Sequence, residues 1–359
     1  MNIISEIHLK KEHFVIPSTF VGAGYKSLVI CGMAEIKSNE DIAFFETKNV
    51  SKSIYHIVFE YKAVLKKFLN EEPEVIMFYH YNILVSAFII MYRIFKPFNN
   101  TVWIIFTDFD TDDQHNFKMG VRKLGWIINS VFANFVTVQS SCHKDILSKY
   151  VRKNKIIPLQ QSFSSKYFNP IKYGDYKRER KILCVCRVIR EKGLEVLIRS
   201  FAKISDKFSD WRIHIVGPID DAIYWRGLIT LINESCVNQN FIFTGMLVGE
   251  PLKEEYKSAS IFCLPSFNES LGISRYEAAI NGIPVITSDA GCANDLASAG
   301  MQVFKRGDVA ALVGLLGDLM ESEELRISIS NKQLESIKSL EENVLDTIKT
   351  INEPPSSKR

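Results

Sequence analysis

The sequence predicts an α/β protein made of two doubly wound domains, each built on a parallel sheet. Its 359 residues are more than twice the ~150 of a typical domain. Short β-rich apolar runs alternate with longer segments of helical period, which is the pattern of parallel strands joined by helices. The alternation stops at the charged segment Ser164–Arg180 and then restarts. We therefore predict an interdomain linker at this segment.

Five apolar runs in the first half predict the strands of one parallel sheet: Ser27–Cys31, Glu74–Tyr79, Thr101–Phe106, Phe135–Gln139 and Lys155–Leu159. The segments between them have apolar residues spaced by three or four, which predicts helices. These helices are expected at Ser51–Leu69, Val121–Phe132 and Ser141–Tyr150. The run Ile83–Tyr92 is too short to cross a bilayer and predicts a helix buried against the sheet.

Six further runs predict a second sheet: Lys181–Cys186, Arg212–Val216, Phe241–Phe243, Ser260–Leu264, Pro284–Ser288 and Met301–Phe304. Two or three helices are expected over Asp308–Asn352, and the tail EPPSSKR is expected to be disordered. We therefore place the domains at residues 1–172 and 173–340. Residues 341–359 are expected to form a C-terminal helix, which packs back on the first domain, and the tail.

The composition excludes several classes of protein. Lys and Arg number 44 and Asp and Glu 41, a net charge of +3 that is too small for a typical nucleic-acid partner. The seven cysteines lie mostly in apolar runs, as in proteins of a reducing cytoplasm. Cys184 and Cys186 alternate along a strand, so no zinc site is expected. The first residues lack the apolar core of a secretory signal, which predicts a cytoplasmic location.

The most informative segment is Pro265–Ser288, where a strand, a glycine-containing turn and a helix start follow one another. Free backbone amides and the helix dipole make such a place an anion site, with the amides of Gly272 and Ile273 as candidates. Glu269 and Glu277 flank this turn with seven residues between them. Carboxylates at these positions can accept hydrogen bonds from sugar hydroxyls. Taken alone, the pair is also typical of a solvated helix face.

This segment resembles the nucleotide-sugar-dependent glycosyltransferases of the large retaining family 4, which have the GT-B fold. The resemblance rests on the E-x7-E motif Glu269–Glu277 and on the residues that continue it, Ala278, Gly282, Pro284, Val285, Ser288 and Gly291. Upstream, Cys184–Ser200 resembles the arginine- and lysine-containing segment of that family. The resemblance implies two Rossmann-like domains that face each other across a cleft.

The resemblance also implies a role for each matching residue. Arg187 and Lys192 would bind the donor diphosphate, and Gly217 and Gly245 would end strands whose loops border the base and the ribose. Glu269 would hold hydroxyls of the transferred sugar and Glu277 those of the ribose. The remaining donor contacts would come from the turn itself, that is, from Ser270, Leu271, Gly272 and Ile273.

Several positions depart from the family pattern. Cys186 stands where the family has a glycine before its arginine, Ser270–Leu271 replaces glycine-phenylalanine, and Ser274 replaces proline. Arg275 occupies an ordinarily apolar place. We expect its side chain to face solvent, with a phosphate contact as the alternative.

The first half contributes the acidic loop TDFDTDDQH after the strand Thr101–Phe106. By the resemblance this loop faces the donor sugar, so Asp108 or Asp110 is expected to position the acceptor hydroxyl, with His115 as a second choice. A Mg²⁺ site at Asp108 and Asp110 and a solvated acidic loop are the alternatives. We expect no metal and no cofactor beyond the nucleotide diphosphate sugar, which is a co-substrate.

The segment Phe117–Phe135 joins Lys118, Arg122, Lys123 and Trp126 to an apolar stripe. This combination suits a helix that lies on anionic lipid at the inner face of the cell membrane, where a lipid-linked glycan acceptor would be found. An ordinary amphipathic helix packed on the sheet is the alternative.

The predicted reaction is transfer of a hexose-type sugar to a hydroxyl of a glycan in bacterial surface polysaccharide synthesis, with retention of anomeric configuration. Because no protein nucleophile is generally accepted for such enzymes, the resemblance implies a front-face substitution. Two alternatives remain, a GT-B-type nucleotide-sugar epimerase and a non-catalytic two-domain sugar-binding protein.

Overall fold

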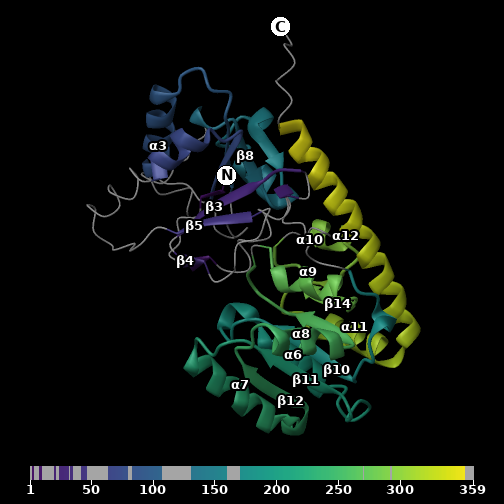
Figure 1. The fold of residues 1–359 in the computed structure, drawn as a ribbon. Helices are drawn as coiled ribbons and strands as arrows, with labels where there is room; N and C mark the ends of the chain where they lie inside the picture. Colours follow the sequence, from purple (N-terminus) through teal and green to yellow (C-terminus); the bar gives the residue numbers. More distant parts are fainter. Residues whose placement is uncertain are drawn as a thin grey trace. The chain divides into compact units, whose positions relative to one another are not determined.

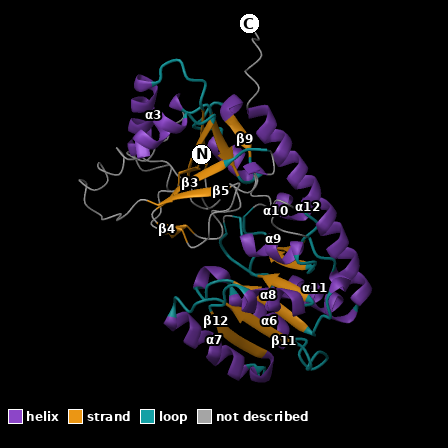
Figure 2. Ribbon diagram, in the orientation of Figure 1, coloured by secondary structure: helices purple, strands orange, loops and turns teal. Residues whose placement is uncertain are grey.

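The computed structural model divides into two compact units, Met1–Phe168 with Leu340–Arg359, and Asn169–Ser339 (Figure 1). Both units are built on parallel sheets with helices on them (Figure 2), so the predicted α/β fold class is confirmed. The structure describes residues 2–3, 8–9, 20–21, 24–31, 33–34, 42–46, 64–79, 83–106, 131–159, 170–269, 271–291 and 293–351.

The first unit contains a seven-stranded sheet in the order β5-β3-β1-β6-β7-β8-β9, in which every pairing is parallel. All five predicted strands are present, and β3 has the predicted bounds. The seven strands are β1 Asn2–Ile3, β3 Ser27–Cys31, β5 Ile42–Glu46, β6 Val75–Tyr79, β7 Val102–Phe106, β8 Phe135–Val138 and β9 Ile156–Pro158. The sequence reasoning missed β1 and β5, and also the short parallel pair of β2 His8–Leu9 with β4 Met33–Ala34.

Aromatic packing attaches helix α3, Ile83–Phe95, to this sheet. Phe88 lies edge-on to Phe68, which belongs to the helical residues 64–71, and also contacts the ring of Trp103 on β7. The buried helix expected at Ile83–Tyr92 is therefore present. Helix α5, Ser141–Leu147, covers β8 and β9 and begins at Ser140, whose hydroxyl accepts a hydrogen bond from the amide of His143. Residues 51–63 and 117–130 of two predicted segments lie outside the described residues.

The second unit contains a six-stranded sheet in the order β12-β11-β10-β13-β14-β15. This is the doubly wound order of dinucleotide-binding folds, in which ligands bind beyond the carboxyl ends of the strands. All six predicted strands are present: β10 Lys181–Val185, β11 Arg212–Val216, β12 Phe241–Gly245, β13 Ile261–Leu264, β14 Val285–Ser288 and β15 Gln302–Phe304. Each residue of β13 and β14 is buried, as expected for strands covered on both faces.

Helices α6 to α11 belong to the second unit, and α12 has residues in both units. Their bounds are α6 Leu194–Ala202, α7 Ala222–Glu234, α8 Glu250–Ser258, α9 Ile273–Ile280, α10 Ala293–Ser298, α11 Val309–Glu321 and α12 Glu323–Ile351. Near its end, α12 places Val344, Ile348 and Ile351 in one cluster with Met77 and Ile104 of the first sheet. In the part of the chain that the structure describes, no helix is both long and apolar enough to cross a membrane.

The predicted linker differs from the structure over residues 170–180. Tyr173 is buried, and the amide of Ile171 donates to the carbonyl of Ile280. The guanidinium of Arg178 donates to five carbonyls, those of Tyr173, Tyr256, Lys257, Ala259 and Asn281. These contacts make residues 170–180 a part of the second unit rather than a free connection.

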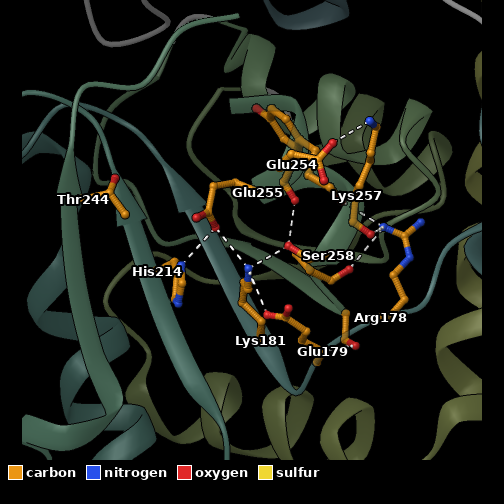
Figure 3. A network of polar contacts seen from close by, with 12 residues as sticks. Arg178, Glu179, Lys181, His214, Thr244, Glu254, Glu255, Lys257 and Ser258 are labelled. Carbon is orange, nitrogen blue, oxygen red and sulfur yellow. Dashed lines mark hydrogen bonds and ion pairs between the residues drawn. The ribbon is translucent and has the colours of Figure 1, made fainter. Parts of the chain in front are cut away.

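A network of charged side chains joins α8 to the strands beneath it (Figure 3). The Glu255 carboxylate lies 3.0 Å from Nδ1 of His214 on β11 and 3.3 Å from Nζ of Lys181 on β10. Lys181 also donates to the hydroxyl of Ser258 at 2.7 Å. Burial opposes the charge on Glu255, but the hydrogen bond from His214 and the charge of Lys181 bring its pKa below the usual value. The network therefore favours the ionised carboxylate.

Candidate active site

A buried ion pair lies beyond the carboxyl ends of β10 and β13. Nζ of Lys192, in a short 3-10 turn after β10, is 2.6 Å from Oε1 of Glu269, in the loop after β13. The side chains are only 16% and 9% exposed. The hydroxyl of Ser266 donates to the same carboxylate oxygen at 2.9 Å. The structure thus brings together a cation predicted to bind the diphosphate and the carboxylate predicted to bind the sugar.

Backbone contacts fix the loop that carries Glu269. The amides of Phe267 and Asn268 both donate to the carbonyl of Glu191, in the turn that carries Lys192. The hydroxyl of Ser288, the last residue of β14, donates to the carbonyl of Ser266 at 2.6 Å. The two segments of the ion pair therefore hold each other in place independently of their side chains.

Arg306 holds the same loop from the other side. Its Nη1 donates to the carbonyl of Phe267 at 2.9 Å, while its backbone amide and its Nε donate to Oδ1 of Asp289. A planar guanidinium can make such contacts in two directions at once. We therefore regard Arg306 as a residue that positions the loop of Glu269.

Gly193 lies where the loop after β10 closely approaches the loop after β13. A Cβ at Gly193 would lie 2.4 Å from the carbonyl oxygen of Pro265, and the residue has a φ of +60°. Only glycine meets both conditions without strain. The glycine that follows Lys192 in the sequence is thus required by packing.

Helix α9 begins where the sequence predicts, with Gly272 as its N-cap and Ile273 as its first residue. The expectation for Arg275 is wrong: its side chain is fully buried. Its guanidinium donates to the hydroxyl of Thr287 at 3.0 Å and to the carbonyls of Ala290 and Leu271 at 3.0 and 3.1 Å. Burial lowers the pKa of Arg275, and the charge of Glu269 opposes this effect. Arg275 therefore braces the turn from inside the fold, facing neither solvent nor a phosphate.

Glu277 lies about one turn further along α9, and a residue of α8 contacts its side chain. The buried hydroxyl of Tyr256 donates to its Oε2 at 2.8 Å. Burial, together with the Glu277 carboxylate, raises the pKa of Tyr256 well above its usual value, so the phenol stays protonated. This contact holds the carboxylate of Glu277 against α8.

The side chain of Arg187 is exposed and lies near one acidic residue. Nη1 of Arg187 lies 3.6 Å from Oδ2 of Asp220, in the loop after β11, and both side chains are largely exposed. An exposed pair of this length is weak and can exchange partners at little cost.

Leu271 is buried, and its carbonyl accepts a hydrogen bond from Arg275. Any donor contact of Leu271 would therefore come from its backbone amide.

Gly217 and Gly245 end neighbouring strands and touch each other through a hydrogen bond of 2.9 Å from the Gly217 amide to the Gly245 carbonyl. A Cβ on Gly217 would lie 1.9 Å from the carbonyl oxygen of Cys186. The close backbone approach at this point is therefore present although Cys186 replaces the family glycine, because Gly217 provides the space.

Several predicted residues cannot be placed. Asp108, Asp110, His115 and Ser270 lie outside the described residues. Among the residues that are described, no group of three or more His, Cys, Asp or Glu side chains is arranged to hold a metal ion.

The sequence did not indicate three residues at this site: Ser266, Tyr256 and Arg306. Tyr256 and Arg306 act through partners in other elements, so spacing along the chain does not reveal them. Only Ser266 could have been suspected, because it lies three residues before Glu269 in the same loop.

Residues 166–335 match the family described as Glycosyl transferases group 1. An uncharacterised glycosyltransferase of Methanocaldococcus jannaschii is 35% identical over 113 residues, which are 32% of this chain and 28% of that protein. The capsular polysaccharide biosynthesis glycosyltransferase CapM of Staphylococcus aureus is 26% identical over 208 residues, 54% of this chain and 53% of that protein. The chain therefore spans well under two thirds of the length of these two relatives.

Solved structures of similar fold extend over both units. Sucrose-phosphate synthase from Thermosynechococcus elongatus aligns with a TM-score of 0.68 at 14% identity and covers 98% of this chain and 97% of that one. HepE of Anabaena, solved in complex with UDP and glucose, aligns with a TM-score of 0.68 at 13% identity and covers 97% and 99%. These matches establish the GT-B fold for the chain. Residues 166–335, the part of the chain that matches the Glycosyl transferases group 1 family, include the Lys192–Glu269 pair.

Proposed function

We propose that this protein is a retaining glycosyltransferase that moves a hexose-type sugar from a nucleotide diphosphate sugar to a hydroxyl of a glycan acceptor. The observation that carries the proposal is the contact of Lys192 with Glu269 within the family-matched domain. This contact brings together a cation that can bind a leaving diphosphate and a carboxylate that can accept hydrogen bonds from sugar hydroxyls. Both lie at the carboxyl ends of the strands, where doubly wound sheets bind ligands.

The proposed roles of the donor-side residues follow from their chemistry. Lys192 and Arg187 neutralise the charge that develops on the diphosphate, assisted by the amides of Gly272 and Ile273 at the start of α9. Glu269 accepts hydrogen bonds from hydroxyls of the transferred sugar, and Glu277 from those of the ribose. Gly217 and Gly245 border the base and the ribose, because their backbones lie at the ends of β11 and β12.

The proposed step is a front-face substitution. The bond between the anomeric carbon and the diphosphate oxygen breaks, while the acceptor oxygen bonds to the same face of the sugar. The proton of the acceptor hydroxyl passes to an oxygen of the leaving diphosphate, so no protein nucleophile is needed. Asp108 or Asp110 would orient the acceptor, and catalysis comes from positioning and from stabilising the departing charge.

The proposed setting is synthesis of bacterial surface polysaccharide on a glycan or lipid-linked glycan acceptor at the inner face of the cell membrane. The name of the Staphylococcus aureus relative, a capsular polysaccharide glycosyltransferase, supports this setting. The bound UDP and glucose of HepE support a nucleotide-sugar donor. No metal is assigned to the reaction, because the cations of the proposed site come from the chain itself.

A thermal-shift screen against a panel of nucleotide sugars tests donor binding, because a ligand that binds only the folded state raises the melting temperature. With the donor so identified, release of free nucleotide is measured with and without glycan acceptors. The proposal expects release that depends on acceptor and a product that keeps the anomeric configuration of the donor sugar by NMR. Release without acceptor, with conversion of the sugar to its epimer, would instead make the protein an epimerase.

The variant Glu269→Gln tests the role of this carboxylate in transfer. Its control is Glu254→Gln, on the exposed face of α8. Removing a group that stabilises the transition state lowers turnover by about 100-fold or more, so the Glu269 variant should lose transfer while its melting temperature stays within a few degrees. Full activity of the Glu269 variant, or equal losses in both variants, would refute the role of Glu269.

A further inference from the structure

The large hydrophobic side chains that are exposed in the described part of the first unit gather at one place. They belong to α3, to the turn that follows it, and to residue 131: Ile90, Met91, Ile94, Phe95, Phe98 and Val131. Phe98 is 97% exposed, Ile94 69% and Phe95 61%. Single exposed apolar residues are ordinary, but a contiguous group of this kind marks a surface that something covers.

Helix α3 is apolar on both of its sides. Phe88, Ile89 and Tyr92 face the sheet and are buried, while Ile90 and Ile94 face away and are exposed. In a soluble protein the outward side of such a helix normally carries charged residues. Here its sequence, ILVSAFIIMYRIF, has a single charged residue, Arg93. The outward side of α3 is therefore built for an apolar environment.

Residues 131–132 connect this side of α3 to the segment Phe117–Phe135. They are helical, and Phe132 packs on the cluster that contains Phe88 and Tyr92, while Val131 is 65% exposed. The sequence of that segment, with its lysines, Arg122 and Trp126, independently suits a helix lying on lipid. Phe132, in the described part of this segment, packs beside α3.

Cations border the apolar surface. Nζ of Lys155 donates to the carbonyls of Val131 and Ala133, and its pKa is lowered by burial and by the nearby charges of Arg152 and Arg93. Among the described residues, neither Arg93 nor Arg152 forms an ion pair. Arg93 and Arg152 are thus near enough to Lys155 for their charges to act on it, and an anionic surface would be attracted to this group of cations.

We propose that the exposed end of α3 with Phe98 and Val131 is a surface that binds an anionic lipid bilayer, with the aromatic side chains entering the interface and the exposed Arg93 and Arg152 meeting the headgroups. Lipid is favoured over a protein partner because protein interfaces have few charged residues at their centre. Here the cations lie on the same helix end and strand region as exposed aromatic residues, with Phe98 97% and Phe95 61% exposed. This inference does not depend on the sugar chemistry of the second unit.

Flotation of the full chain with vesicles tests the proposal. Binding is expected to vesicles of equimolar phosphatidylcholine and phosphatidylglycerol, and little to phosphatidylcholine alone. High salt should weaken the binding, because each cation near an anionic surface contributes about fivefold to the partition coefficient. Failure of the wild-type chain to float with the anionic vesicles would overturn the proposal.

The apolar contribution is tested by the double variant Phe95→Ser, Phe98→Ser. Its matched control is Met246→Ser, Val248→Ser, which removes two exposed apolar side chains, each 68% exposed, from the second unit. The first variant should lose at least about tenfold in partition coefficient, while the control floats like the wild type. Melting temperatures of both variants confirm that each is folded. Equal flotation of the two double variants would overturn the proposal.

The charge contribution is tested by Arg93→Glu with Arg152→Glu, compared with Arg180→Glu on the second unit, where Arg180 is 69% exposed. The paired variant should lose flotation and the control should keep it. Size-exclusion chromatography with light scattering, without lipid, provides a further arm. If the wild type is a dimer that the Phe95, Phe98 variant makes monomeric, the surface covers a second copy of the chain and the lipid proposal is wrong.

Discussion

Nζ of Lys192 lies 2.6 Å from Oε1 of Glu269, so two residues assigned to different parts of one donor are partners of each other. Under the proposed function, a diphosphate that binds Lys192 would compete with Glu269 for the ammonium, and a sugar that binds Glu269 would compete with Lys192 for the carboxylate. The two halves of a nucleotide sugar would then be recognised in a coupled way, since each half would release the residue that the other half needs.

A double-mutant cycle measures the interaction of the Lys192 and Glu269 side chains in the absence of any ligand. Lys192→Met leaves a carboxylate that is 9% exposed without its cation, and we expect a loss of about 2 kcal/mol in the free energy of unfolding. Glu269→Gln should also destabilise, while the double variant should recover about 1–3 kcal/mol relative to the sum of the singles. Urea unfolding supplies the values. Strict additivity would show that the two side chains do not interact in solution.

Arg275→Met is expected to lower the free energy of unfolding by about 3 kcal/mol, because three buried acceptors lose their donor. Arg180→Met is the control, since Arg180 is an exposed arginine paired with Asp210. It should change stability by no more than about 0.5 kcal/mol. Guanidinium chloride is avoided as denaturant, and urea is used for both variants. Similar stability of the two would contradict the buried position of Arg275.

Gly217→Ala is expected to destabilise by about 2 kcal/mol or more, because its Cβ would lie 1.9 Å from the Cys186 carbonyl oxygen. Gly227→Ala is the matched control: Gly227 lies inside α7, and a Cβ there meets nothing within 4 Å. Alanine at this helical position should stabilise by about 0.5–1 kcal/mol. Thermal unfolding of both proteins measures the difference, and a tolerated Gly217 substitution would argue against the tight approach.

The Glu255 network predicts a dependence of stability on pH. The pKa of Glu255 is below the ordinary value of 4.5 in the folded protein, so its ionised form stabilises the fold. This contribution is complete above pH 4.5 and is lost as pH falls through the lower, folded value. Glu255→Gln should therefore be less stable than the wild type at neutral pH, and the gap should narrow in acid. Glu254→Gln, an exposed neighbour on α8, should show no such convergence.

The elements predicted from the sequence are those with a clear apolar pattern and turn residues at their ends. The runs of β3 and β11 have strong apolar patterns and turn residues on both sides, and their predicted bounds agree with the structure. The strand β1 has only two residues, and β5 is a short run without a following turn signal. Such strands form because neighbouring strands provide hydrogen-bond partners. The local sequence pattern does not indicate that these partners are present.

Residues whose partners lie far along the chain were harder to predict. Arg275 and Arg178 look like surface residues in a sequence, since arginine is seldom buried. Their acceptors are carbonyls, which every residue has, so no partner stands out. In contrast, the assignments of Lys192, Glu269 and Gly272 needed no distant partner, because the family motif and the order of strand, turn and helix start can be recognised within one short segment of sequence.

The first unit is assembled from two stretches of chain, Met1–Phe168 and Leu340–Arg359, and its core includes Val344, Ile348 and Ile351. During synthesis from the N-terminus, the residues of the second unit leave the ribosome before those last side chains do. Phe20, Val21 and Met77 thus lack part of their cover until α12 has been synthesised. A nascent chain that stops before α12 is complete would keep this apolar surface open to chaperones and to aggregation.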